Sequence, residues 1–136
     1  MSVAPDLDAL FATARAVQQK AYAPYSRFKV GAAILADDGK VYPGCNVENA
    51  AYPVGACAEA GAISAMIAGG ARAISAIVVI GDGAELVTPC GACRQRIREF
   101  AVPETPIVIA GPDGIRARFS LAELLPASFG PANLPK

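Results

Sequence analysis

Three of the four cysteines in this chain have the spacing of metal ligands. Cys90 and Cys93 enclose only Gly91 and Ala92, and this gap lets both sulfurs face one ion. Cys57 lies upstream, at the expected start of another helix. Helix N-termini stabilise thiolates, so lowered cysteine pKa values are expected there. Three protein ligands on Zn²⁺ leave one tetrahedral position for water, which is typical of a catalytic zinc site.

Glu59 is the only charged residue between Cys57 and Arg72. It stands among small apolar residues, so we expect it to reach a metal-bound water without binding the metal itself. The chain has no histidine, which excludes Ser-His-Asp and Cys-His catalysis and any imidazole ligand on zinc. A carboxylate is therefore the expected proton carrier. Burial would raise its pKa and the metal would lower it, so its net direction stays open.

These residues also have simpler interpretations. Cys45 could join the other three cysteines in a closed structural zinc site, although a cysteine next to Gly44 in a strand more often packs as a small apolar residue. Glu59 could lie on a solvated helix face, but its apolar neighbours disfavour this. The small residues of its helix could serve core packing in a monomer, or contact with another layer or subunit.

Helices and strands alternate in the later part of the chain, which predicts one α/β domain, residues 1–136, with a mixed sheet. The expected elements are a helix capped by Asp6, strands over 28–36 and 40–48, a helix from 57 to the glycines at 69 and 70, a buried strand over 73–82, a helix over 91–100, strands over 105–111 and 115–119, and a short helix over 120–125. Right-handed crossovers would place the two cysteine helices side by side, with their N-termini at one edge of the sheet.

Composition narrows the class of partner. The 12 basic and 12 acidic residues balance, so a nucleic-acid partner is disfavoured and a small neutral ligand is favoured. Hydrophobic residues make up 54% of the chain, which favours burial of part of the surface by further subunits. Asp6 and Asp8 stand where a signal peptide needs an apolar run, and no run is long enough to span a membrane. We expect a cytoplasmic protein with reduced cysteines.

The stretches CAE at 57–59 and PCGACRQ at 89–95 resemble the zinc motif of the cytidine deaminase family, with cysteine where tRNA- and base-editing deaminases have histidine. Further segments resemble that family in the same order: APYSRFKVGAA at 23–33, GCNVENAAYP at 44–53 and LLPASFGP at 124–131. The resemblance implies a three-layer α/β/α sandwich with a mixed five-stranded sheet, one Zn²⁺ per chain and a homotetramer.

The resemblance also implies roles for single residues. Cys57, Cys90 and Cys93 would bind zinc, and Glu59 would be the catalytic residue. The substrate-binding residues that it implies are Ala58, Phe28 against the base, and Asn46 and Glu48 on the ribose hydroxyls. Ala50 and Tyr52 would reach into the site of a neighbouring subunit, and Phe129 would close over the base bound there.

One position departs from the family pattern. The family commonly continues CAE with an arginine hydrogen-bonded to the ligand sulfurs, whereas this chain has Ala60. Because Zn²⁺ and three thiolates sum to one net negative charge, we expect either a less acidic metal-bound water or compensation by Arg94. Arg96 and Arg98 are expected on a solvated helix surface.

The favoured function is zinc-dependent hydrolysis of cytidine and deoxycytidine to uridine and deoxyuridine, with release of ammonia, as in pyrimidine salvage. Glu59 would take a proton from the metal-bound water and pass protons to N3 and the leaving amine. A deaminase of a nucleoside-like antibiotic such as blasticidin S is the nearest alternative, disfavoured by the ribose-type segment and the FGP tail. A non-enzymatic four-cysteine zinc module and an RNA- or DNA-editing enzyme are alternatives from other classes.

Overall fold

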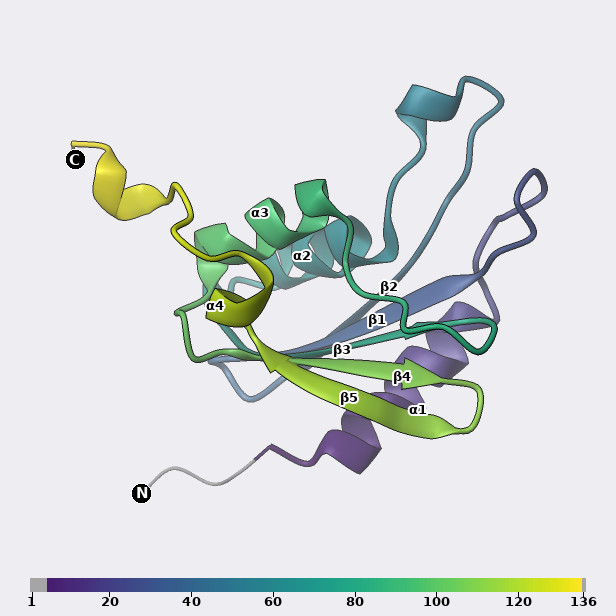
Figure 1. The fold of residues 1–136 in the computed structure, drawn as a ribbon, viewed down its shortest axis with the longest axis horizontal. Coiled ribbons are helices and arrows are strands. Elements are labelled where there is room, and N and C mark those ends of the chain that lie inside the picture. Colours follow the sequence, from purple (N-terminus) through teal and green to yellow (C-terminus); the bar gives the residue numbers. More distant parts are fainter. Residues whose placement is uncertain (1–4, 136) are drawn as a thin grey trace.

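One five-stranded sheet lies between two layers of helices in the computed structural model, which describes residues 5–135 (Figure 1). Its order is β2-β1-β3-β4-β5, and within it only β3 and β4 pair in parallel. The strands are β1 (Val30–Ala36), β2 (Val41–Cys45), β3 (Ile74–Gly81), β4 (Pro106–Gly111) and β5 (Gly114–Ser120). The predicted α/β class and mixed five-stranded sheet are confirmed.

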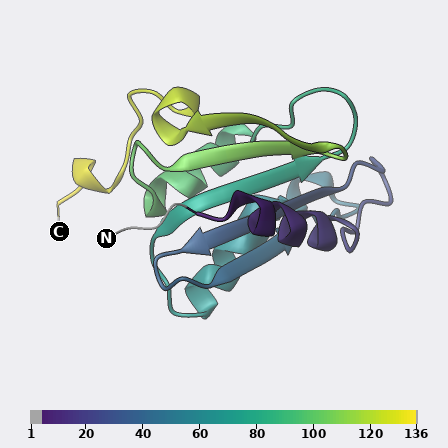
Figure 2. The ribbon, with the colours of Figure 1, turned by 90° about the horizontal axis from the view of Figure 1, so that it is seen from below.

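The helices divide between the two faces of the sheet (Figure 2). Helix α1 (Leu7–Gln18) covers one face, and α2 (Ala58–Ala68) and α3 (Gly91–Phe100) lie side by side on the other. A short helix α4 (Leu121–Leu124) follows β5, and 3-10 turns η1 (Tyr52–Val54) and η2 (Pro131–Asn133) stand outside the layers. None of the helices in residues 5–135 has the length and apolar character needed to cross a membrane.

Local sequence explains where the first and last α-helices begin. The Asp6 carboxylate accepts a hydrogen bond from the Ala9 N–H at 3.1 Å, and it thereby caps α1 as expected. Ser120 and Glu123 form a reciprocal capping box at α4, in which each side chain accepts from the backbone N–H of the other residue. The capping residues therefore fix both starting points.

Strand β3 separates the two hydrophobic cores. Its side chains alternate between the faces, as the two-residue period of a strand requires. Ile77 and Val79 pack into the core beneath α2 and α3, whereas Val78 and Ile80 pack into the core beneath α1. This continuous apolar run is the buried central strand that the sequence predicted, and it anchors the layer that carries the cysteines.

Gly44 lets α2 pack directly on the neighbouring strand. A Cβ atom at this position would overlap the backbone carbonyl of Ala58 and the backbone N–H of Ala62. Gly61 lies on the facing side of α2, and a Cβ atom there would meet the Cys45 carbonyl and the Gly44 Cα at an ordinary 3.7 Å. The absence of a side chain at Gly44 therefore sets how closely the helix that follows Cys57 approaches the sheet.

Two substitutions across this contact should change stability in opposite directions. Gly44→Ala inserts a methyl group against α2 backbone, and we expect it to lower the free energy of unfolding by about 1–3 kcal/mol. Gly61→Ala has room and relieves the entropic cost of a helical glycine, so it should raise the free energy of unfolding by about 0.5–1 kcal/mol. Urea unfolding of both variants tests the pair. Equal effects would contradict the close packing of β2 and α2.

Candidate metal centre and active site

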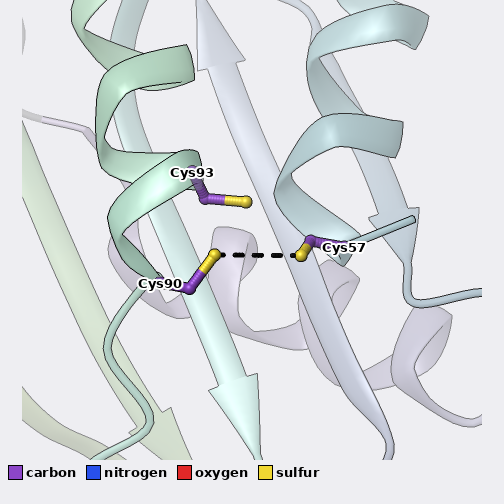
Figure 3. Close-up of side chains that lie close together, drawn as sticks. All are labelled: Cys57, Cys90 and Cys93. Atoms are coloured by element: carbon purple, nitrogen blue, oxygen red, sulfur yellow. Dashed lines mark hydrogen bonds between the residues drawn. The ribbon is translucent and has the colours of Figure 1, made fainter. Parts of the chain in front are cut away.

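The N-termini of α2 and α3 bring three cysteine sulfurs together. Cys57 and Cys90 are the N-cap residues of these helices, both extended in backbone conformation, and neither side chain caps its own helix. Cys93 lies on the first turn of α3. The three Sγ atoms lie within 4.8 Å of one another, and those of Cys57 and Cys90 are 3.9 Å apart (Figure 3).

This arrangement fits a zinc ion. Tetrahedral Zn–S bonds of about 2.3 Å place neighbouring sulfurs about 3.8 Å apart, close to the distance between Cys57 and Cys90. Within residues 5–135, the candidate ligand group contains Cys57, Cys90 and Cys93 but not Cys45. Cys45 is a half-buried free cysteine at the end of β2. The cluster therefore has the donors of an open three-cysteine site, not of a closed four-cysteine site.

The thiol pKa values correct the expectation from the helix ends. Burial raises the pKa of the Cys93 thiol, and negative charge on Glu59 and Cys57 acts in the same direction. Burial also raises the pKa of Cys57. At Cys90 burial is outweighed by hydrogen bonds from the Cys93 backbone N–H and the other two thiols, so its pKa is lowered. The expected lowering is thus confirmed only for Cys90, because desolvation dominates at the other two cysteines.

Glu59 is buried beside the sulfurs. It lies on the first turn of α2, and its exposed fraction is 4%. Burial raises the pKa of its carboxyl group, while its own backbone and the positive charge of Arg96 oppose the rise. The interpretation of Glu59 as a solvated surface residue is therefore wrong. A carboxyl group in this position, beside the cysteine cluster, is placed to accept and release protons.

Arg96, not Arg94, contacts the cysteine cluster. The three donor groups of Arg94 bind the Pro89 carbonyl at 2.8 Å, the Leu124 carbonyl at 2.9 Å and the Thr88 hydroxyl at 3.0 Å. Arg96 instead donates from Nη1 to the Cys93 Sγ at 3.4 Å. The expected compensation by Arg94 therefore does not match the contacts, because its guanidinium ties the loop before α3 to the end of α4.

A cavity of about 570 Å³ opens beside Cys57, Cys90 and Glu59. Four of the residues expected to bind substrate also line it: Asn46, Glu48, Tyr52 and Ala58. Its volume suits a small molecule. The cluster and the cavity together can hold a metal ion beside a polar small molecule.

Asn46 and Glu48 lie beyond the end of β2, not on it as predicted. Bridges from Val47 to Tyr22 and Ala56 hold this segment in place of a continued strand. The Asn46 amide accepts from the Val30 N–H and donates to the Phe28 carbonyl. The Glu48 carboxylate accepts from the Tyr25 and Ser26 backbone N–H groups and from the Ser26 hydroxyl.

Phe28, Ala50 and Phe129 do not line the cavity of this chain. All three are exposed, and Phe129 has an exposed fraction of 58%. The Phe129 carbonyl accepts from the Gln95 side chain at 2.9 Å, which holds the C-terminal segment against α3. Tyr52 lines the cavity but is 75% exposed, with its ring centroid 5.9 Å from that of Tyr25.

Sequence reasoning missed several residues of this site. Tyr25, Ser26, Val87 and Thr88 line the cavity, and Ser26 also orients Glu48. Ser26 and Thr88 each lie two residues from a predicted site residue, Phe28 and Cys90, and this closeness in sequence could have indicated them. The signal for Arg96 was its spacing of three residues from Cys93, which places both on one helix face.

The chain is similar to known proteins over nearly its whole length. A family model described as "Cytidine and deoxycytidylate deaminase zinc-binding region" matches residues 5–109. The chain is 41% identical over 129 residues to a cytidine deaminase of Sporosarcina psychrophila, with 95% of each chain covered. It is 44% identical over 135 residues to a cytidine deaminase of Mycobacterium tuberculosis, with 97% of each covered. The crystal structure of a cytidine deaminase from Burkholderia pseudomallei superposes with a TM-score of 0.84 at 45% identity, covering 90% of this chain and 98% of that one.

Single cysteine substitutions should distinguish the three zinc ligands from Cys45, which is not expected to bind the metal. Alanine at position 57, 90 or 93 removes one donor of the cluster, and we expect each such variant to lose most of its bound zinc. Cys45→Ala is the matched control and should keep one zinc per chain. Elemental analysis of the purified proteins measures the ratio. Loss of zinc in Cys45→Ala would point instead to a closed four-cysteine site.

Proposed function

The chain belongs to the cytidine and deoxycytidylate deaminase family, and on that premise we propose that it hydrolyses cytidine and deoxycytidine to uridine and deoxyuridine, releasing ammonia. The observation that carries the proposal is the buried Glu59 carboxyl group, which lines the same cavity as Cys57 and Cys90. A proton carrier, a metal-binding cluster and a cavity for a small molecule thus share one place. The balanced charge of the chain fits a nucleoside better than a nucleic-acid polymer.

The chemistry divides between the metal and the chain. Zinc held by Cys57, Cys90 and Cys93 would supply an acidified water as the nucleophile that attacks C4 of the pyrimidine. Glu59 would take one proton from the attacking water and deliver it to N3, then take the second proton from the hydroxyl group now on C4 and deliver it to the departing amine, which leaves uridine and ammonia. Burial raises the pKa of this carboxyl group, which favours its holding a proton between uptake and delivery.

The substrate-binding part of the proposal assigns the ribose to the wall formed by Asn46 and Glu48. Their present hydrogen bonds to residues 25–30 hold both side chains in fixed orientations. Each retains acceptor capacity for a ribose hydroxyl. Phe28 would pack against the base, and Ala58 would offer backbone groups at the mouth of the metal centre.

A homotetramer would complete each site. Phe129, Tyr52 and Ala50 are exposed in one chain, and in the proposed assembly they enter the site of a neighbour. Burial of aromatic side chains such as Phe129 and Tyr52 is a usual source of interface energy. A cytoplasmic location belongs to the same proposal, because all four cysteines are free and the ligand thiols must stay reduced.

Glu59→Gln should separate metal binding from catalysis. The amide keeps the size of the side chain but cannot carry a proton, so we expect unchanged zinc content and a fall in kcat of at least about 100-fold. The fall in ultraviolet absorbance that accompanies conversion of cytidine to uridine measures the rate. Substantial activity in Glu59→Gln would refute the assigned role. Turnover of blasticidin S but not of cytidine by the wild-type chain would refute the assigned substrate.

Mixed assemblies can test whether neighbouring chains complete the site. Glu59→Gln chains lack the proton carrier and Phe129→Ala chains lack the aromatic lid, and we expect each variant to have low activity alone. Heteromers formed by refolding the two together contain sites with Glu59 from one chain and Phe129 from the other. Their activity should exceed the sum of the separate variants. Activity equal to that sum would contradict shared sites.

A further inference from the structure

Arg96 reaches from the surface of α3 to a buried cysteine. Its guanidinium Nη1 donates to the Cys93 Sγ at 3.4 Å, and the two residues are three positions apart on one helix face. Cys93 is fully buried, whereas Arg96 is exposed. An exposed arginine normally extends into water, because water solvates its charge well. Here the side chain instead folds back along its own helix onto a sulfur of the metal cluster.

The net charge of the zinc-loaded cluster explains why a cation beside Cys93 would be stabilising. Zn²⁺ offsets two of three thiolate charges, so the bound site keeps one negative charge in apolar surroundings, where an unpaired charge is costly. The helix N-termini supply roughly half a positive charge each. They act most directly on Cys57 and Cys90, the two N-cap residues. Cys93 lies inside the first turn of α3, so its sulfur has the greatest need of a separate cation.

The other basic residues of α3 are committed elsewhere. Arg94 binds Pro89, Leu124 and Thr88 through all three of its guanidinium nitrogens. Arg98 donates from Nε to the Ser128 hydroxyl at 2.9 Å. Among residues 5–135, Arg96 is the only basic side chain whose hydrogen bond ends on a cysteine sulfur.

We propose that Arg96 is the positioning residue that offsets the excess negative charge of the three-thiolate zinc centre and orients the Cys93 sulfur toward the metal. The inference rests on the proposed zinc-dependent function and extends it to a residue outside the cavity. In this role Arg96 touches neither substrate nor metal. Its effect is on how tightly the three cysteines hold zinc.

The test is zinc affinity, measured by competition with a chromogenic chelator on wild-type, Arg96→Gln, Arg96→Lys and Arg15→Gln chains. Loss of an outer-shell partner typically costs 10–100-fold in metal affinity, and we expect a loss in that range for Arg96→Gln. Arg96→Lys keeps the charge and should recover most of the affinity. Arg15→Gln changes net charge equally, but from an exposed position on α1 across the sheet, and should match wild type. The deficit of Arg96→Gln should shrink in high salt, because the contact is partly exposed.

Two results would overturn the inference. The first is equal zinc affinity in Arg96→Gln and wild type. The second is equally weak binding by Arg96→Gln and Arg96→Lys when both unfold at the wild-type temperature, because the loss would then not follow the charge. Cytidine turnover is not part of this readout. A chain that needs Arg96 to hold zinc but does not deaminate cytidine would refute the proposed function and leave this inference standing.

Discussion

The site depends on two helices that begin next to each other on one face of the sheet. Because Cys57 and Cys90 are N-cap residues and neither caps its helix, both sulfurs are free to point into the gap between α2 and α3. The positive ends of both helix dipoles meet at this gap, where thiolate charge collects. Because Gly44 has no side chain, α2, the helix that follows Cys57, packs directly against β2.

The balance between negative and positive charge explains most other features of the site. A three-cysteine zinc centre brings one excess negative charge into an apolar layer, and Glu59 adds a second acidic group beside it. Because the neighbouring side chains of α2 are small, Glu59 is almost fully buried, and this burial raises the pKa of its carboxyl group. Two helix ends and the Arg96 guanidinium supply the opposing positive charge. Proton transfer by Glu59 and zinc binding by the cysteines therefore both depend on the same nearby charges.

Sequence reasoning identified the parts of this molecule that follow from local patterns. The element order, the central strand, the Asp6 cap and the three-cysteine cluster came from periodicity and spacing. The end of β2 at Cys45 did not, because bridges from Val47 to two distant segments replace the expected pairing. The sequence also did not show that Arg96, and not Arg94, contacts Cys93. The two arginines lie two positions apart on one helix, and what separates them is the direction in which each side chain points. Cysteine pKa values were misjudged because helix position is visible in a sequence and burial depth is not.

X-ray absorption at the zinc edge of the purified wild-type protein distinguishes an open three-cysteine zinc site from a closed four-cysteine one. We expect three sulfur neighbours at about 2.3 Å and one light atom at about 2.0 Å, the signature of a site with one position open for reaction. Four sulfur neighbours would contradict it, because a closed shell has no place for the attacking water, and Glu59 would then have no proton to carry.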